Sequence, residues 1–297
     1  MRILRTPEER FADLPDYPFA PRYTEVDGLR IHHVEEGPAD ADPVLLLHGE
    51  PTWSYLYRRM IPVLAAAGHR AVAPDLVGFG RSDKPAERSA YSYDRHVEWI
   101  KAWIAARDLR RITLVGQDWG SLIGLRLVAE LPDRFARVVI GNGFLPAGER
   151  RAPFVFRVWK AFARWSPWFP IGRIVQAGSA TRLPPEVIAA YDAPFPSAEH
   201  KAGARMFPLL VPLTPDHPAT PANRRAWEVL ERWDRPFLTA FSDLDPIFRG
   251  ADRVLQRRIP GAAGQPHTTI RGAGHFLQED RGPEFARVIA DFIARTP

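Results

Sequence analysis

Short, uninterrupted apolar runs alternate along the chain with longer segments in which apolar residues recur at helical spacing. Such runs are typical of strands buried on both faces of a parallel sheet. Residues 44–47 form such a run, and residues 112–115 are β-branched or apolar throughout. Further strands are predicted at residues 70–74, 137–140, 236–241 and 267–270. Helical spacing is clearest in residues 54–66, 93–107, 122–128 and 283–294. This alternation predicts an α/β fold with a mostly parallel central sheet flanked by helices.

Two segments depart from this alternation. Residues 22–36 contain two apolar stretches on either side of an Asp-Gly pair, which is a favoured tight turn, so we expect a β-hairpin. Residues 145–223 show no strand pattern and are dense in prolines and aromatic residues, which indicates short helices broken by prolines. A disordered linker is the weaker interpretation, because disordered segments are poor in aromatic residues. We therefore predict a core domain of residues 1–144 and 224–297 and an inserted helical cap of residues 145–223.

The composition excludes several classes of protein. The 297-residue chain has no cysteine, which excludes disulfides, thiol nucleophiles and thiolate metal sites. Its nine histidines lack paired metal-ligand spacing. The net charge is +5, but we interpret the cations as scattered among acids, without a basic cluster interleaved with aromatics. No apolar run reaches the roughly 18 residues that a membrane span needs, and the charged N-terminus has no apolar signal core. We expect a cytoplasmic monomer that binds no metal, nucleic acid or membrane.

Candidate chemistry first appears in a sharp turn between one buried strand and the helix that follows it. The turn is Gly116-Gln117-Asp118-Trp119-Gly120, and its small residues at both ends are typical of a nucleophile elbow. Such an elbow presents its central residue, here Asp118, at the top of the sheet. A carboxylate can attack a saturated carbon directly, which favours carbon–halogen or epoxide opening over ester cleavage. Taken alone, the turn is equally compatible with a loop whose aspartate caps the next helix.

Two further polar positions follow later strands. His275 lies in a glycine-rich turn after residues 267–270, and either Asp243 or Asp245 follows residues 236–241. Because the carboxyl ends of parallel strands meet at one edge of the sheet, these side chains can converge on the elbow. A lone histidine is more often structural, but the order nucleophile, acid, histidine is that of α/β-hydrolases. We favour Asp245 as the acid because it precedes a proline and matches the family pattern better.

Four segments together carry a specific resemblance to a known family. They are His48-Gly49-Glu50-Pro51-Thr52-Trp53-Ser54-Tyr55-Leu56-Tyr57-Arg58, Gln117-Asp118-Trp119-Gly120, Ala193-Pro194-Phe195-Pro196 and Gly274-His275-Phe276. With them the chain resembles the haloalkane dehalogenases over nearly its whole length, and more narrowly the subfamily of the dichloroethane-hydrolysing enzyme. The resemblance implies an α/β-hydrolase fold with an inserted helical cap. It also implies hydrolysis of a haloalkane to a primary alcohol, halide and a proton, without a cofactor.

The resemblance implies a role for each site residue. Asp118 is the nucleophile, His275 is the base that activates water, and Asp245 orients His275 and stabilises its cation. The backbone N–H groups of Glu50 and Trp119 form the oxyanion hole. The Glu50 side chain is assigned a part in holding the hydrolytic water.

The leaving halide is expected to lie against two indole N–H groups. An indole nitrogen is a donor only, so it suits an anion. Trp119 supplies one of these groups and a cap tryptophan the other. Trp159 is the motif match, with Trp165 and Trp168 as alternatives, and any of the three is also compatible with a purely structural place in the cap.

Three rival functions make different demands on the sequence. An epoxide hydrolase shares the fold and the aspartate but needs two cap tyrosines, whereas residues 145–233 contain only Tyr191. A fluoroacetate-type dehalogenase has arginine after the nucleophile, where this chain has Trp119. A non-enzymatic relative typically lacks a triad member or the water-handling residues, all of which are present here. We therefore expect an uncharged haloalkane as the substrate.

Overall fold

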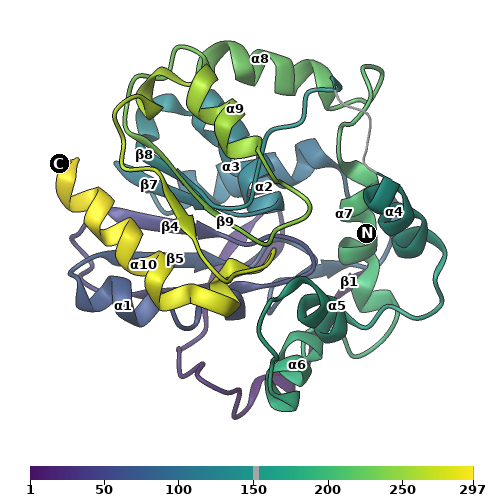
Figure 1. Ribbon diagram of the computed structural model, residues 1–297. Coiled ribbons are helices and arrows are strands. Elements are labelled where there is room, and N and C mark those ends of the chain that lie inside the picture. Colours follow the sequence, from purple (N-terminus) through teal and green to yellow (C-terminus); the bar gives the residue numbers. More distant parts are fainter. Residues whose placement is uncertain (150–153, 297) are drawn as a thin grey trace.

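The computed structural model describes residues 1–149 and 154–296. Its main sheet has eight strands in the order β10-β9-β8-β7-β4-β5-β3-β2 (Figure 1). The strands are β2 Arg22–Val26, β3 Leu29–Glu36, β4 Pro43–Leu47, β5 Arg70–Pro74, β7 Ile112–Gly116, β8 Phe135–Ile140, β9 Phe237–Ser242 and β10 Thr268–Ile270. β3 is antiparallel to both of its neighbours, and the other neighbouring pairs are parallel. The predicted α/β fold and the predicted hairpin at residues 22–36 are confirmed.

Helices cover both faces of this sheet. α1 packs on α10 on one face, while α2 packs on α3 and α3 on α8 on the other. The core helices are α1 Ile61–Ala66, α2 Tyr93–Ala106, α3 Trp119–Glu130, α9 Ala251–Arg258 and α10 Leu277–Arg295. Because both faces are covered, every residue of the central strands β4 and β7 is buried. Across the described residues, we find no helix that is long and apolar enough to cross a membrane.

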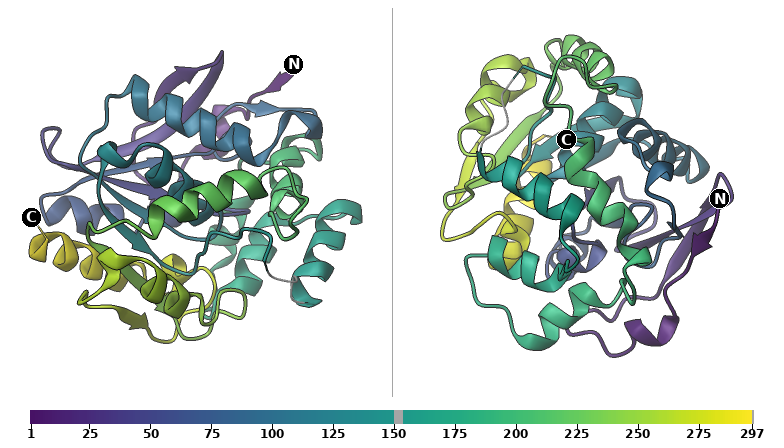
Figure 2. Two further views of the ribbon diagram at one scale, coloured as in Figure 1. Left: turned by 90° about the horizontal axis from the view of Figure 1, so that it is seen from above. Right: turned by 90° about the vertical axis from the view of Figure 1, so that its right-hand side faces the viewer.

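A helical insertion separates β8 from β9, as the sequence predicts. Its helices are α4 Phe154–Trp165, α5 Ile171–Gly178, α6 Pro185–Asp192, α7 Ala202–Leu210 and α8 Thr220–Leu230. α4 to α7 group at one side of the sheet in all three views (Figures 1 and 2). α8 begins just inside the predicted cap boundary at residue 223 but packs on α3 of the core. The cap boundaries stay a prediction, and residues 150–153 of the cap lie outside the described residues.

The predicted helix at residues 54–66 is wrong as a single element. The segment forms a 3₁₀ turn, Ser54–Tyr57, followed by α1. Pro62 lies in the first turn of α1, where its missing N–H costs nothing, whereas a continuous helix would place it in the interior. The Ser54 N–H donates to the Asp75 Oδ1 at 2.7 Å, which also fixes the start of the turn. A short two-stranded sheet of β1 Ile3–Leu4 and β6 Lys84–Pro85, together with α9, was not predicted.

Candidate active site

Asp118 lies at the tip of a sharp turn between β7 and α3. Its backbone φ of 49° is in the left-handed region, which residues other than glycine rarely adopt. A Cβ on Gly120 would lie 1.8 Å from the Leu47 carbonyl oxygen, and one on Gly116 would lie 2.9 Å from the Gly120 carbonyl oxygen. Only glycine fits at either end of this turn, which therefore has the geometry of a nucleophile elbow.

Two backbone N–H groups hold the Asp118 carboxylate. The Glu50 N–H donates to Asp118 Oδ1 at 2.8 Å, and the Trp119 N–H also bonds the carboxylate. A Cβ on Gly49 would lie 2.4 Å from the Asp118 Cβ, so this close approach requires glycine. Burial is the largest influence on the pKa of Asp118 and raises it, whereas nearby His275 and the two N–H groups oppose part of that rise. Both predicted oxyanion-hole donors thus converge on the predicted nucleophile.

His275 stands between two carboxylates. Its Nε2 lies 3.7 Å from Asp118 Oδ2, and its Nδ1 lies 3.3 Å from Asp245 Oδ1. Burial by itself would lower the pKa of His275, but Asp245 and then Asp118 outweigh burial, so the pKa is raised. Burial would raise the pKa of Asp245, but His275 and the N–H groups of Ile247 and Phe248 leave it below its ordinary value. The three predicted triad residues, which lie far apart in the sequence, are therefore adjacent in space.

The second acid candidate, Asp243, bonds the backbone of a neighbouring turn. Its Oδ1 accepts a hydrogen bond from the Gly272 N–H at 2.8 Å, in the turn that leads to His275. Of the two aspartates considered from the sequence, it is Asp245 whose carboxylate faces the His275 ring.

A cavity of about 820 Å³ lies over the elbow, between the core and the cap. Its described lining is largely apolar and includes the predicted site residues Glu50, Asp118, Trp119, Trp159 and His275. The alternatives Trp165 and Trp168 are not among the described lining residues and are 73% and 60% exposed. Burial and then the neighbouring Asp118 raise the pKa of Glu50 well above its ordinary value. Over residues 1–149 and 154–296, no group of three or more potential ligands could hold a metal ion.

Asn142, just after β8, organises the site, although no sequence pattern pointed to it. Its carbonyl oxygen accepts from the Asp118 N–H at 2.9 Å. Its side-chain amide donates to the carbonyl oxygens of Gly274 and His275, both at 3.0 Å. The fully buried Asn142 thus ties the nucleophile turn to the histidine turn. The amide of Gln117 adds to this link, lying 3.2 Å from both the His275 carbonyl oxygen and the His275 Nε2.

The histidine turn is also tied to the cap. The His275 N–H donates to the Gly178 carbonyl oxygen at 2.7 Å, at the end of α5. Asp280 accepts from the N–H groups of Gly274, at 2.7 Å, and Ala180, at 2.9 Å. A buried carboxylate with several N–H partners fixes the positions of those partners, so Asp280 holds the cap segment against the histidine turn.

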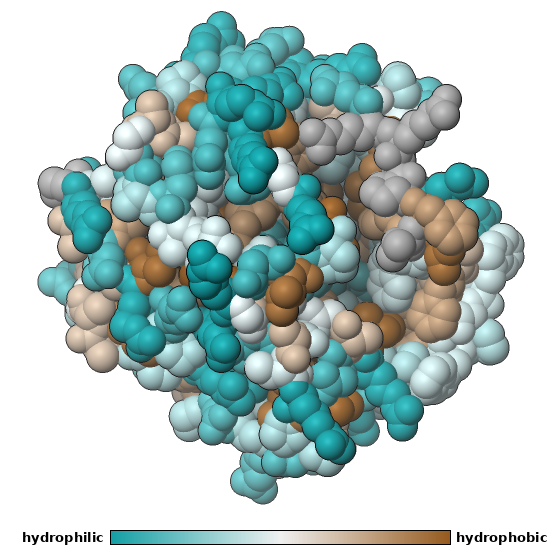
Figure 3. Space-filling model, viewed as in Figure 1, coloured by the Kyte–Doolittle hydropathy of each residue, from teal (hydrophilic) through white to brown (hydrophobic). Residues whose placement is uncertain are grey.

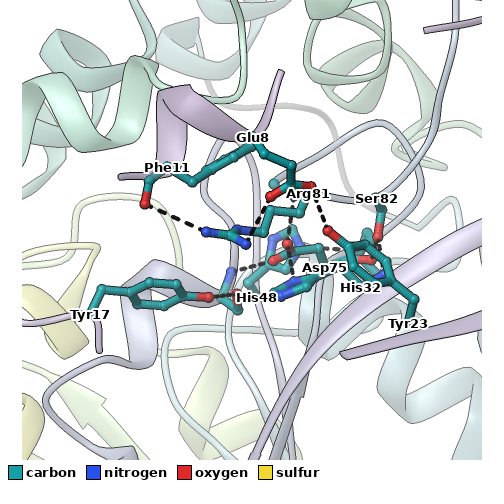
Figure 4. Close-up of polar contacts among 12 residues, drawn as sticks. Glu8, Phe11, Tyr17, Tyr23, His32, His48, Asp75, Arg81 and Ser82 are labelled. Carbon is teal, nitrogen blue, oxygen red and sulfur yellow. Dashed lines mark hydrogen bonds and ion pairs between the residues drawn. The ribbon is translucent and has the colours of Figure 1, made fainter. Parts of the chain in front are cut away.

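A second buried carboxylate, Asp75, lies among polar partners (Figure 4) and bonds the N–H of Ser54, close after Glu50 in the sequence. Asp75 Oδ2 lies 2.7 Å from His32 Nδ1 and accepts from the Arg81 N–H at 2.8 Å, while its Oδ1 accepts from Ser54. Burial opposes ionisation, but His32, His48 and the hydrogen bonds together outweigh it and hold the pKa of Asp75 well below its usual range. Nearby, His48 Nε2 accepts from the Leu76 N–H at 2.9 Å. His48 and Asp75 are therefore structural.

Tyr191, the tyrosine that bears on the epoxide hydrolase alternative, is fully buried. Its hydroxyl donates to the Glu279 carboxylate, which also pairs with Arg58. Tyr191 is absent from the described cavity lining, so its hydroxyl is not offered to a substrate there.

Comparison with known proteins agrees with this geometry. Residues 42–282 match the family model of the alpha/beta hydrolase fold. A haloalkane dehalogenase of Psychrobacter cryohalolentis is 57% identical over 302 residues, covering 100% of both chains. Haloalkane dehalogenase 1 of Mycobacterium tuberculosis is 59% identical over 291 residues, covering 96% of this chain and 97% of the relative. The chain belongs to the haloalkane dehalogenases. The family predicted from the four sequence segments is thereby confirmed, while its placement in the dichloroethane-hydrolysing subfamily stays a prediction.

Solved structures of this dehalogenase family have the same fold. The tetrameric structure of a haloalkane dehalogenase from Paraglaciecola agarilytica is 37% identical, with a TM-score of 0.90 over 99% of this chain and 98% of that chain. A haloalkane dehalogenase from Agrobacterium tumefaciens is 26% identical, with a TM-score of 0.82 over 98% of this chain and 100% of that chain. The fold shared with these two structures therefore covers 98–99% of this chain.

Proposed function

We propose that this haloalkane dehalogenase converts haloalkanes to primary alcohols in two steps, through an alkyl ester of Asp118. The observation that carries the proposal is the Asp118 carboxylate at the floor of an apolar cavity, with His275 3.7 Å away. The Glu50 N–H engages Oδ1, and we assign the other oxygen, Oδ2, as the attacking atom. In the first step Oδ2 bonds to the carbon that carries the halogen, and the carbon–halogen bond breaks as halide leaves with the bonding electrons.

In the second step His275 Nε2 takes a proton from water, and the water oxygen attacks the carboxyl carbon of Asp118. Negative charge develops on Oδ1, where the N–H groups of Glu50 and Trp119 stabilise it. Asp245 stabilises the imidazolium cation. The bond between the carboxyl carbon and the ester oxygen then breaks, and the departing oxygen takes the second proton of the water and leaves as the alcohol. Asp118 returns as a carboxylate, and the first proton leaves His275 for solvent.

The substrate class is the first test of this proposal. We expect halide release from neutral bromoalkanes and no opening of an epoxide of similar size, because the described cavity lining is apolar and contains no tyrosine. Haloacetates should react more slowly than bromoalkanes, since desolvating their carboxylate beside Asp118 is unfavourable. Halide release assayed on the three substrate classes measures this. The exposed Arg249 lines the cavity and could attract the carboxylate of a haloacetate, so haloacetates are a stringent comparison. Faster halide release from haloacetates than from bromoalkanes would refute the assignment of a neutral substrate.

Halide binding by Trp119 and Trp159 is part of the proposal and predicts a fluorescence change. Bromide should quench tryptophan fluorescence in the resting protein, and Trp159→Phe should weaken both the quenching and the turnover. Phenylalanine keeps an aromatic ring but removes the N–H donor. Trp165→Phe and Trp168→Phe are the matched controls and should behave like the wild type. If Trp165→Phe lowers turnover while Trp159→Phe does not, the choice of cap tryptophan is wrong.

The monomeric state and the cytoplasmic location expected from the sequence also remain proposals. The similar structure from Paraglaciecola agarilytica is tetrameric, so light scattering on the purified chain is the decisive measurement of its size. Fractionation of cells that produce the chain tests the location.

A further inference from the structure

Positive charge in this protein is concentrated in one part of the cap. Residues 154–185 contain five cations and no Asp or Glu, whereas the whole chain carries +5, so the rest of the sequence has as many acids as cations. The five cations are Arg157, Lys160, Arg164, Arg173 and Arg182. The expectation of evenly scattered cations is therefore wrong. The same segment holds three of the nine tryptophans, so it interleaves cations with aromatic residues.

The helix α4 in this segment has two apolar faces. On its inner face, Phe156 and Trp159 line the cavity. Its outer side carries Phe154, Val158 and Trp165, at spacings of four and seven residues, which places them in one row. These three are 75%, 52% and 73% exposed, and Trp168, just beyond the helix, is 60% exposed. We call these four residues the outer row.

The outer row is unusual for a free surface. Figure 3 shows apolar colouring gathered on the side of the molecule where α4 lies, next to a hollow. Isolated exposed apolar residues are ordinary, but several large ones gathered on one side of a helix are typical of an interaction site. Cations accompany the aromatic rings: the Arg164 guanidinium lies 4.7 Å from the Trp165 ring centre, and that of Arg173 lies 5.8 Å from the Trp168 ring centre.

We propose that the outer row, with its flanking arginines, docks this enzyme on an anionic lipid surface. Tryptophan favours the boundary between lipid and water because its ring is apolar and its N–H is polar. Arginine and lysine beside such a row are attracted by anionic headgroups, and the absence of acids from residues 154–185 removes opposing repulsion. Such docking requires no membrane-spanning helix. We therefore propose peripheral membrane binding in place of the expectation that the protein has no membrane partner.

Other partners fit the outer row less well. Single-stranded nucleic acid binds aromatic and cationic side chains in a groove that follows its backbone, whereas the outer row lies on the outward side of one helix. A second copy of the chain would bring Arg164 and Arg173 of one row against the same arginines of the other where the two rows face each other. The inner face of α4 forms part of the cavity wall, so lipid docking would also place the cavity beside the lipid, in which apolar haloalkanes dissolve. Only this last consequence rests on the proposed function.

Vesicle binding without substrate tests the proposal independently of catalysis. The protein should sediment with vesicles of phosphatidylcholine and phosphatidylglycerol and bind at least about tenfold less to pure phosphatidylcholine. Added salt should reduce the binding, because it screens the charges. The double variant Trp165→Ser and Trp168→Ser should lose the binding but keep its bromoalkane turnover in solution, since neither residue lines the described cavity.

Charge reversal supplies a matched pair. Arg157→Glu, in α4, should weaken binding to the anionic vesicles, whereas Arg232→Glu, another exposed arginine outside the segment, should not. The proposal is overturned if the Trp165/Trp168 variant binds as well as the wild type or if both charge reversals act equally. It is also overturned if the wild type ignores anionic vesicles, or if light scattering shows an oligomer that the double variant dissociates.

Discussion

Replacing His275 with phenylalanine should give a protein that releases about one halide per active site and then stops. Asp118 is a carboxylate held by two N–H groups and needs no base for its attack, so alkylation should survive the change. Hydrolysis of the ester should not survive it, because the described cavity lining contains no second histidine to take the proton from water. Loss of a general base lowers turnover by ~10²–10⁴-fold. A serine nucleophile would fail already at the first step, since it depends on the histidine.

Phenylalanine is the suitable replacement because the His275 ring already lies among aromatic rings. It stacks on Phe248 at 6.0 Å and meets the edge of Phe276 at 4.8 Å between ring centres. Rapid mixing with a bromoalkane measures the burst, and mass spectrometry should find one alkyl group on the peptide that contains Asp118. Asp118→Ala is the control and should give neither. A folded His275→Phe protein without a burst and without alkylation would refute the two-step mechanism.

The elbow could be predicted from the sequence because its signals are local. A buried strand, glycines at both ends of a short turn and a helical pattern specify the backbone at Asp118 without long-range information. His275 and Asp245 could be selected because they follow strands whose carboxyl ends must meet at one edge of the sheet. The choice between Asp243 and Asp245 depended on a family pattern, since both side chains follow the same strand.

The supporting residues could not be predicted, because their role lies in contacts between distant segments. Asn142 joins the turns at residues 118 and 275, and Asp280 joins residue 274 to the cap. Asparagine and aspartate after a strand or in a helix are common, and no local pattern distinguishes these two. The outer side of α4 was missed for a related reason. The net charge of the whole chain conceals a local excess of cations, and the two faces of that helix separate only once its partners are known.

Asp245→Asn should abolish most turnover while leaving the halide burst intact. Asparagine keeps the shape of the side chain but cannot stabilise the His275 cation, so ester hydrolysis should slow by about 10²–10⁴-fold. Asp243→Asn is the matched control. Its Oδ1 can still accept from the Gly272 N–H, so turnover should change only a few-fold. An equal loss in both variants would contradict the assignment of Asp245 to the triad.

The pH profile of the same variant separates a catalytic from a merely structural role for Asp245. In the wild type, Asp245 and Asp118 raise the pKa of His275 against the lowering effect of burial. Because the neutral ring is the base, ester hydrolysis should fall as the pH drops through that raised pKa. Without the Asp245 charge, less opposes the effect of burial, so the pKa of His275 falls. The acid limb of the pH profile of ester hydrolysis should therefore move to lower pH. Single-turnover hydrolysis of the alkylated enzyme, measured from acid to neutral pH, reports this limb directly. An acid limb that stays in place in Asp245→Asn would show that this carboxylate does not act on His275.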